Sequence, residues 1–524
     1  MSEDYYKGRV VAQMSTEFRS VASKDVISNP NRDHLRQMAR HQERTTRHGS
    51  AVYITKVRSR SAKNTFVVPA GYEPGIGQQV ISKDTARDLA FRVQEYLKDR
   101  KVIRLDRDMG QHPNSTYHCR LYITQDFARI PYMWMSTLYD PSEPDSRPDF
   151  VSIYVPEWPE RIIFAHPEEG TTYILGTDYF GECKKSFLRM AMYAAKKEGG
   201  LGLHAGSKVL RLRTESGLQD TGFILFGLSG TGKTTLTMHD HYLEGEEQAI
   251  IRQDDVVLMA PNGRCLGTES GFFIKTEGLT PSQTILYQAA TGADAIFENV
   301  AVDSEGNLDF ADVSLTSNGR GVIARDTVPL TAQNIDLDKA SKVVFITRRK
   351  DVIPPVARLS PYQAAAFFML GESIETSAGD PTRAGQSIRE VGTNPFVVGP
   401  EAEEGNRLLR IVLDNPDMEC YLLNTGAVGV SAKSAGADIT VEVSTAILEQ
   451  IARGQIEWTR DPFWGYEVAT SVPGVHMSIY DPRQYLGSDE YRRRNENLRL
   501  ERQEWLARYP DLDPGISESI GCSP

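Results

Sequence analysis

The 524-residue chain has no long apolar run, only five cysteines and no surplus of basic residues. No segment approaches the roughly 18 consecutive apolar residues of a membrane span, and the first residues contain no apolar stretch of signal-peptide length. We therefore expect a protein without a membrane partner. The cysteines stand singly, without a C-x-x-C pair, which favours a reducing cytoplasm.

Acidic residues outnumber basic residues, and the formal net charge is −11. This balance argues against general affinity for nucleic acid or for an anionic membrane, so an anionic ligand must bind at a local basic site. The composition, 40% hydrophobic and 25% charged, is typical of a globular protein with two domains or one large composite domain. Internal repeats and low-complexity tracts are also absent from the sequence.

The most specific motif is FILFGLSGTGKTTLT, from Phe223 to Thr237. Its first four residues predict a short buried strand, and the residues from Thr235 onward predict the start of a helix. Between them stands G-x-x-x-x-G-K-T, the pattern of a loop whose backbone N–H groups bind phosphate. A glycine-rich surface loop without a ligand is the alternative, but strand and helix flank the motif on the correct sides.

This loop predicts a nucleoside triphosphate site. Lys233 adds a point charge, Thr234 offers a hydroxyl to Mg²⁺, and the positive end of the following helix faces the same anion. The predicted nucleotide-binding residues are Gly227, Leu228, Ser229, Gly230, Thr231, Gly232, Lys233, Thr234 and Thr235.

Several weaker signals accompany the loop. Asp254 and Asp255 end a predicted strand, as a metal-binding acidic motif would, although a surface turn is the alternative. Lys184 and Lys185 lie at the start of a helix predicted near Glu182, where the helix dipole disfavours cations, so a compensating anion or metal is expected.

Three further side chains are ambiguous when taken singly. His204 stands alone, and a single histidine is more often structural than a ligand. Arg60 lies in a basic turn that can hold a carboxylate or phosphate, although most arginine clusters are solvated surface. Arg320 lies just past a predicted hairpin turn.

Five further helices are predicted. An exposed helix is expected in the segment that ends at Gly49, and a capped amphipathic helix from Ser82 to Arg100. The later ones are expected from Pro361 to Gly371, from Thr440 to Ala452 and from Ser488 to Tyr509.

Taken in chain order, the motifs resemble the ATP-dependent phosphoenolpyruvate carboxykinase family over nearly the whole chain. The matching stretches are VRSRSAKNTFVV, PDFVSIYV, ILGTDYFGECKK, LGLHAG, FGLSGTGKTTLT, DDVVL, FIKT, ENVAVD, SLTSNGR, IPPVARLSP, YLLNTG and PGVHMSIYDPRQY. The resemblance implies an α/β fold of two domains. Residues 1–210 would form an N-terminal substrate-binding domain, and residues 211–524 a C-terminal P-loop mononucleotide-binding domain with a mixed sheet.

The resemblance also implies an activity in gluconeogenesis: metal-dependent decarboxylation and phosphorylation of oxaloacetate to phosphoenolpyruvate by a nucleoside triphosphate, ATP favoured. The implied partners are oxaloacetate or phosphoenolpyruvate, the nucleotide and carbon dioxide, in a monomer or small homo-oligomer. One alternative is a P-loop kinase of the same fold acting on another small oxoacid or phosphoryl donor. Another is a catalytically silent nucleotide-binding regulator, which would have little need of a second metal site.

Roles carry over by position. Arg60 matches the arginine that binds the substrate carboxylate, Arg320 the one that bridges substrate and transferred phosphoryl, and Tyr179 the tyrosine beside the enolate. Lys184 matches a lysine that faces nucleotide and substrate. Lys185, His204 and Asp255, the last preceded by Asp254, match the ligands of the catalytic Mn²⁺, and Thr234 matches the Mg²⁺ ligand. A lysine can ligate a metal only as the neutral amine, which a nearby divalent cation favours.

The sequence departs from the family pattern near the nucleotide. Val256, Val257 and Leu258 follow Asp255, where the family has acidic, histidine and tryptophan residues, and Ala427 replaces a tryptophan. Asp438 stands where an arginine that reaches the nucleotide is expected. We expect Asp438 to turn away from phosphate. Either Lys433 replaces the lost charge, or the nucleotide binds less tightly than in relatives.

Overall fold

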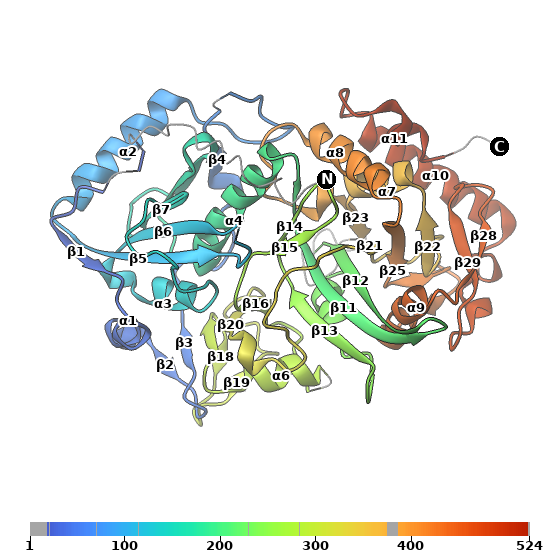
Figure 1. Cartoon of the computed structure of the whole chain (residues 1–524), viewed down its shortest axis with the longest axis horizontal. Helices are drawn as coiled ribbons and strands as arrows, with labels where there is room; N and C mark the ends of the chain where they lie inside the picture. The colour runs from blue at the N-terminus through green and yellow to red at the C-terminus, as the bar shows by residue number, and fades with distance from the viewer. Residues whose placement is uncertain are drawn as a thin grey trace. The chain divides into compact units, whose positions relative to one another are not determined.

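The computed structural model describes residues 18–19, 21–69, 71–113, 115–228, 230–281, 283–374 and 386–521. The chain forms two compact units (Figure 1). Unit 1 comprises Met1–Ala194, Leu266–Pro329 and Phe396–Pro400; unit 2 comprises Ala195–Cys265, Leu330–Pro395 and Glu401–Pro524. Helices and sheets occur in both, so the predicted mixed α/β class is confirmed. The division of binding roles between residues 1–210 and 211–524 stays a prediction.

Unit 1 is built on a seven-stranded sheet. In spatial order its strands are β1 (Asp25–Ser28), β5 (Lys101–Met109), β6 (Tyr117–Thr124), β7 (Phe150–Val155), β9 (Thr171–Leu175), β8 (Ile162–His166) and β4 (Thr65–Val67). Successive side chains of a strand point to opposite faces. On β7, Val151 and Ile153 pack with the apolar side of α2 (Lys83–Leu97), whereas Ser152 bonds to Ser186 of α4 (Phe180–Lys197). The two helices therefore cover opposite faces (Figure 1).

A second sheet of unit 1 carries several candidate site residues. Its five strands are β16 (Phe272–Lys275), β20 (Arg320–Ile323), β17 (Ile296–Glu298), β3 (Ala51–Tyr53) and β2 (Arg44–Thr45), in that order. The register places Arg320 opposite Glu298 on the neighbouring strand. Shorter elements of the unit are α1 (Arg32–Ala39), α3 (Arg129–Met135), α6 (Thr284–Ala290), β18 (Ala301–Val302) and β19 (Leu308–Asp309).

Unit 2 is built on an eight-stranded sheet. Its strands, in spatial order, are β13 (Gln248–Gln253), β11 (Ala205–Thr214), β12 (Gly217–Gly227), β21 (Lys342–Thr347), β25 (Glu419–Asn424), β22 (Val356–Leu359), β29 (Glu467–Ser471) and β28 (Glu457–Arg460). The three central strands β12, β21 and β25 are parallel, so their carboxyl ends lie at the same edge of the sheet. In open α/β sheets, ligands bind at that edge.

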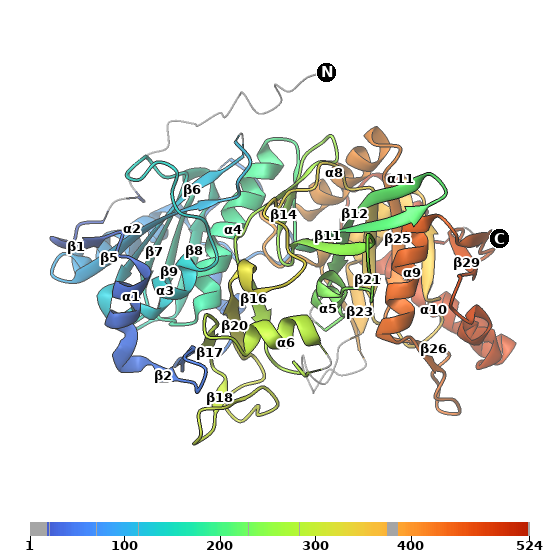
Figure 2. The same cartoon turned by 60° about the horizontal axis from the view of Figure 1, so that its bottom comes forward.

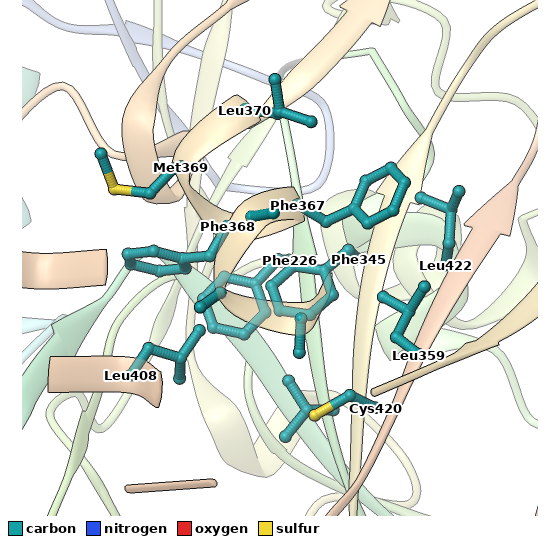
Figure 3. Close-up of a cluster of buried hydrophobic side chains, with 14 of the residues drawn as sticks. Phe226, Phe345, Leu359, Phe367, Phe368, Met369, Leu370, Leu408, Cys420 and Leu422 are labelled. Atoms are coloured by element: carbon teal, nitrogen blue, oxygen red, sulfur yellow. The ribbon is translucent and has the colours of Figure 1, made fainter. Parts of the chain in front are cut away.

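One face of this sheet packs on α7 (Pro361–Leu370) and α8 (Glu401–Asp414), as Figure 3 shows for the residues around Phe226. The rings of Phe226 and Phe345 stack with centroids 5.2 Å apart, and Phe368 meets Phe226 edge-on at 5.8 Å. Every residue of α7 from Gln363 to Leu370 is buried, because the helix lies inside the core.

The other face packs on α5 (Lys233–Met238) and α9 (Val441–Arg453), which supply Leu236 and Ile447 to a second apolar cluster (Figure 2). Unit 2 also contains β10 (Leu201–Leu203), β14 (Val257–Met259), β23 (Glu372–Ile374), β24 (Ser387–Arg389), β26 (Ala427–Val428), β27 (Ala437–Asp438), α10 (Ser488–Leu506) and α11 (Pro514–Glu518). β15 (Cys265–Gly267) spans the point where the chain leaves unit 2 for unit 1.

Four of those five further helices are confirmed as α2, α7, α9 and α10. Ser82, Ser360 and Thr440 cap three of them by accepting hydrogen bonds from backbone N–H groups. The helix expected to run to Gly49 is wrong in its extent, because α1 ends at Ala39 and the chain soon pairs as β2 with β3. No helix in the described ranges has the length and apolarity needed to cross a bilayer.

Candidate functional site

The basic loop of unit 1, residues 56–61, is anchored at both ends. The Asp178 carboxylate accepts hydrogen bonds from the N–H groups of Lys56 at 3.0 Å and Val57 at 2.9 Å. At the other end, the N–H of Ser61 donates to the Glu182 carboxylate at 2.6 Å. Arg161 also donates to the carbonyl of Ser59 and to the Ser61 hydroxyl, each at 2.8 Å. The loop is therefore held in one conformation by the side chains of Asp178, Glu182 and Arg161, which bond mainly to its backbone.

Its two arginines differ in what they contact. Arg58 donates to the carbonyl of Leu315 at 2.8 Å, which gives it a structural role. Arg60 is exposed, and within the described residues no hydrogen bond or ion pair engages its guanidinium. A fixed loop that presents an uncommitted guanidinium suits bidentate binding of a carboxylate.

A buried charge network lies beneath this loop. Arg129 donates to Asp178 and to Glu298, each at 3.0 Å, and Glu298 also accepts the N–H of Phe180, the first residue of α4, at 3.0 Å. Burial raises the pKa of Glu298 to about 7, with a further rise from Asp178, against the opposing effects of Arg129 and the Phe180 N–H. This network ties the basic loop to the start of α4, where Tyr179 and the two lysines lie.

Tyr179 and Arg320 meet directly. Arg320 donates through Nε to the Tyr179 hydroxyl at 3.2 Å and through Nη2 to Asn318 at 2.7 Å. The Tyr179 ring lies over Gly181, where a Cβ would collide with it. Glycine at position 181 therefore allows the ring to lie against the start of α4.

Lys184 joins the same cluster. Its Nζ lies 2.8 Å from Glu269 in a buried ion pair and 5.5 Å from the ring centroid of Phe273, and Arg320 lies 5.6 Å from the same centroid. Glu269 is the compensating anion expected for a lysine at a helix start. The sequence offered no chemical signal for Phe273 or Glu269 beyond their place in ESGFFIKT.

Lys185 points elsewhere in unit 1. Its Nζ lies 5.0 Å from the ring centroid of Phe396, and Arg189 of the next helical turn lies 5.6 Å from the same ring. A lone aromatic ring is a weak acceptor for two cations. Phe396 was another residue that sequence reasoning missed.

In unit 2, the loop motif lies between β12, which ends at Gly227, and α5, which begins at Lys233, two residues before the predicted helix start at Thr235. Gly230 and Gly232 adopt left-handed φ angles of 84° and 94°, which glycine adopts without strain. The Thr231 hydroxyl donates to the carbonyl of Leu228 at 2.8 Å and closes the turn. Lys233, Thr234 and Thr235 are partly exposed at the start of α5. Ser229 lies outside the described residues.

His204 and Asp255, two of the three predicted metal ligands, lie side by side in unit 2. The antiparallel pairing of β10 with β14 places Leu203 opposite Val257, so His204, the next residue, lies near the segment just before β14 that contains Asp255. The His204 Nδ1 lies 2.7 Å from the carbonyl of Thr393, which can only accept, so Nδ1 carries the proton. Nε2 lies 3.1 Å from the Asp255 carboxylate, so it can donate to that carboxylate when protonated or share a cation with it when deprotonated.

This geometry fits a divalent cation, because two acceptor atoms share one space and the second nitrogen of the histidine is fixed by a carbonyl. The described residues contain no group of three or more His, Cys, Asp or Glu side chains placed to hold a metal. The predicted set instead takes a lysine nitrogen as its third ligand. Asp254 is buried beside Asp255 in the bend between β13 and β14.

Thr393 adopts a left-handed φ of 51°, directly after Gly392 at 61°. A β-branched residue rarely adopts this conformation, and such strain gathers at functional sites. Here the strained turn directs the carbonyl that orients His204. No local pattern in the sequence marks Thr393 for this role.

Asp438 and Lys433 belong to one small hairpin. Asp438, on β27, pairs with Ala427 at its base, whereas Lys433 lies in the turn closed by Ser431 and Ser434; both side chains are exposed. The orientation of Asp438 toward a phosphate and the replacement of the lost charge by Lys433 stay predictions.

Comparison with known proteins points in one direction. A family model described as phosphoenolpyruvate carboxykinase matches residues 24–478. A protein of Aeropyrum pernix named phosphoenolpyruvate carboxykinase (ATP) is 39% identical over 368 residues, covering 70% of this chain and 72% of the relative.

Bacterial proteins with the same name are more distant. The one from Mesorhizobium japonicum is 29% identical over 331 residues, and the one from Rhizobium leguminosarum bv. trifolii is 30% identical over 334 residues. Each match covers 62% of this chain and 59% of the bacterial protein, which is less than two thirds of its length.

Proposed function

Because this chain belongs to the ATP-dependent phosphoenolpyruvate carboxykinase family, we propose that it converts oxaloacetate and a nucleoside triphosphate, ATP favoured, into phosphoenolpyruvate, carbon dioxide and the diphosphate. The observation that carries the proposal is the hydrogen bond of Arg320 to the Tyr179 hydroxyl, with Arg320 and the buried Lys184 both near Phe273. A guanidinium and a phenol at one place suit an anionic substrate that gains charge during reaction. The N-terminal domain would bind the oxoacid and the C-terminal P-loop domain the nucleotide.

The oxoacid side of the reaction uses unit 1. Arg60 binds the substrate carboxylate, since its loop is already ordered and little conformational entropy is lost on binding. In this proposal the Tyr179 hydroxyl binds beside the substrate carbonyl that becomes the enolate. Arg320 donates to that hydroxyl through Nε at 3.2 Å.

The nucleotide side uses unit 2. Backbone N–H groups of the loop from Gly227 to Gly232 surround the phosphates, Lys233 adds charge, and Thr234 supplies a hydroxyl ligand for Mg²⁺. His204 and Asp255 would hold Mn²⁺ in this unit, and mixed nitrogen and oxygen ligands suit that ion; Lys185 of unit 1 stays a predicted third ligand. When bound, the metal ions supply positive charge for the enolate and phosphate oxygens.

The proposed chemistry balances within the substrates. The bond between the β-carboxylate and the neighbouring carbon of oxaloacetate breaks, carbon dioxide leaves, and the electron pair moves into the carbonyl to form an enolate. The enolate oxygen then attacks the γ-phosphorus, and the bond to the bridging oxygen breaks to release the diphosphate. Arg320, Lys184 and Lys233 spread the charge of the moving phosphoryl group, so catalysis rests on positioning and charge neutralisation.

A cytoplasmic location is part of the proposal. All the cysteines within the described residues, Cys119, Cys183, Cys265 and Cys420, are buried free thiols, which suits a reducing compartment. A monomer or small homo-oligomer remains the expected assembly.

The test is an assay of purified protein with Mn²⁺ and a panel of nucleotides and oxoacids, following carbon dioxide release and phosphoenolpyruvate by phosphorus NMR. Formation of phosphoenolpyruvate from oxaloacetate is the expected result. Phosphorylation of another oxoacid alone would favour the related kinase, and nucleotide binding without turnover would favour the regulator.

Two variants serve as reciprocal controls. Lys233→Ala should abolish triphosphate binding, whereas Arg60→Ala should raise the KM for oxaloacetate and leave nucleotide affinity unchanged. Both proteins should melt like wild type, because Lys233 is partly exposed and Arg60 is exposed. Wild-type turnover by Lys233→Ala would contradict the assigned phosphate site.

A further inference from the structure

The edge at which β12, β21 and β25 end carries more than the phosphate loop. The register pairs Gly227 with Ile346 and Thr347 with Asn424, so the three strands finish side by side. Figures 1 and 2 show β12 and β21 as neighbours in the same sheet. The segments that leave β21 and β25 therefore lie next to the phosphate loop that leaves β12.

Two side chains from those neighbouring strand ends bind the phosphate loop. Arg348, directly after β21, donates through Nη1 to the carbonyl of Gly230 at 2.9 Å. Thr425, directly after β25, donates through its hydroxyl to the carbonyl of Thr231 at 2.6 Å. The N–H and C=O of a trans peptide point in opposite directions, so the bond to Thr425 directs the N–H of Gly232 away from that side chain.

The two adjacent arginines of this strand end differ in how their charge is used. Arg349 is buried and lies within 2.5 Å of Asp351, which neutralises it. Arg348 is exposed, and the Gly230 carbonyl is its one hydrogen-bond partner within the described residues. Nε and Nη2 of Arg348 are therefore available donors beside a phosphate-binding loop.

The negative charge near the loop means that a phosphate bound there would benefit from the cationic donor Arg348. Asp438 is an exposed acid at the base of the hairpin after β25, and the chain as a whole carries a formal net charge of −11. Lys433, the other cation of that hairpin, lies in the turn at its far end from Asp438. Arg348 is already in contact with the loop and needs no movement to reach it.

We propose that Arg348 is a nucleotide-binding residue whose guanidinium, held at the edge of the loop by the Gly230 carbonyl, donates to the polyphosphate through its Nε and Nη2. This inference rests on the proposed function, because it assumes that the loop binds a nucleoside triphosphate. Planar guanidinium groups bind phosphate oxygens with charge-assisted hydrogen bonds, which are about twice as strong as neutral ones.

The experiment measures binding of Mg·ATP and of adenosine by calorimetry, without turnover. In Arg348→Met the affinity for Mg·ATP should fall about tenfold or more, equivalent to ~1.4 kcal/mol, while adenosine binding is unchanged. Arg348→Lys should recover part of the loss, because lysine keeps the charge without the planar fork.

Lys350→Met is the matched control, since Lys350 is an exposed cation two residues along the same segment. It should bind Mg·ATP as wild type does. An equal loss in Lys350→Met would mean that the segment acts only through general charge, and would overturn the specific role of Arg348. Wild-type affinity in Arg348→Met would overturn it too, as would an equal loss of adenosine and ATP, which would indicate collapse of the loop.

The two levels of proposal can fail separately. If Mg·ATP binding depends on Arg348 but no oxoacid is phosphorylated, the inference stands and the proposed reaction is wrong. If the wild-type protein does not bind Mg·ATP at all, both are wrong.

Discussion

Each unit buries a carboxylate within an arginine network, yet burial raises the pKa of Glu298 in unit 1 to about 7, whereas the pKa of Glu372 in unit 2 falls to about 2. Loss of hydration acts in the same direction at both sites, because it disfavours the charged carboxylate. The outcome differs because the neighbouring charges differ.

In unit 1 a single cation, Arg129, faces two acids, Asp178 and Glu298. In unit 2 three arginines act on Glu372: Arg502 binds it on both oxygens, Arg389 lies 3.6 Å away, and the charge of Arg349 adds to theirs. The comparison teaches that the number of neighbouring cations relative to neighbouring acids, more than the depth of burial, decides whether a buried carboxyl group is charged.

The difference bears on how the two sets of site residues are held. The unit 1 network bonds to backbone N–H groups of the basic loop and of α4, so it positions Arg60 and Tyr179 largely through the main chain. The unit 2 network joins side chains of β23, β24 and α10 to Arg349, next to Arg348. We expect unit 2 to depend more strongly on its ion pairs.

The largest effect is expected for Glu372→Gln. Removing the charge leaves Arg502 buried without its partner, which typically costs about 3–5 kcal/mol. The midpoint of thermal unfolding, followed by calorimetry, should fall for the transition of unit 2. Since the pKa of Glu372 is lowered, its stabilisation is present above pH 4.5 and is lost as the pH falls toward 2.

An unchanged melting profile for Glu372→Gln at neutral pH would contradict the expectation that unit 2 depends strongly on its ion pairs. It would mean that the three arginines gain no net stability from this carboxylate, as happens when a buried ion pair only repays its desolvation.

The stability contributed by Glu298 should depend on pH in the opposite direction to that of Glu372, and Glu298→Gln tests this. The folded protein keeps the proton of Glu298 up to about pH 7, whereas the unfolded chain releases it near pH 4.5. The stability contributed by this group is therefore full below pH 4.5 and declines as the pH rises to about 7, by an amount on the order of 3 kcal/mol.

The amide variant has no such titration, so the difference in unfolding free energy between wild type and Glu298→Gln should change across pH 4.5–7. Denaturant unfolding at several pH values measures it. Parallel pH profiles for the two proteins would show that Glu298 is ionised throughout this range.

A smaller effect is expected at the proposed metal ligands of unit 2. His204→Ala should lower Mn²⁺ affinity by at least about tenfold, the loss typical of changing even an outer-shell partner, while nucleotide affinity stays nearly intact. Paramagnetic relaxation of water protons reports the bound metal. If bound Mn²⁺ is unchanged, His204 serves only to hold the strained turn at Thr393.

The smallest effect should come from Lys433→Ala. Because Lys433 is exposed in a hairpin turn and its charge is screened by salt, Mg·ATP affinity should change by less than about threefold. Asp438→Arg, which replaces a negative charge with a positive one, should tighten the binding of Mg·ATP. A tenfold loss in Lys433→Ala would instead favour Lys433 over Arg348 as the residue that replaces the missing charge.

Features that depend on neighbours in sequence could be predicted. The strand, glycine turn and helix start of the phosphate loop follow from backbone propensities within fifteen residues. Ser82, Ser360 and Thr440 cap helices through bonds to N–H groups three residues away, and these helix starts were found where expected. The prediction of a helix up to Gly49 failed because β2 pairs with β3. A local sequence pattern contains no information about this pairing.

The sequence by itself thus determined the strand, glycine-rich turn and helix start of residues 223–237, the main helices and, through ordered motifs, the family. Tertiary structure alone decided that Glu269 neutralises Lys184, that Phe273 lies near both Lys184 and Arg320, and that Arg348 reaches the loop at Gly230. It also decided that the Thr393 carbonyl, 189 positions away, orients His204. The physical reason is that local bonds form among residues already held together by the chain, whereas these contacts depend on strand register and packing, which many distant residues set together.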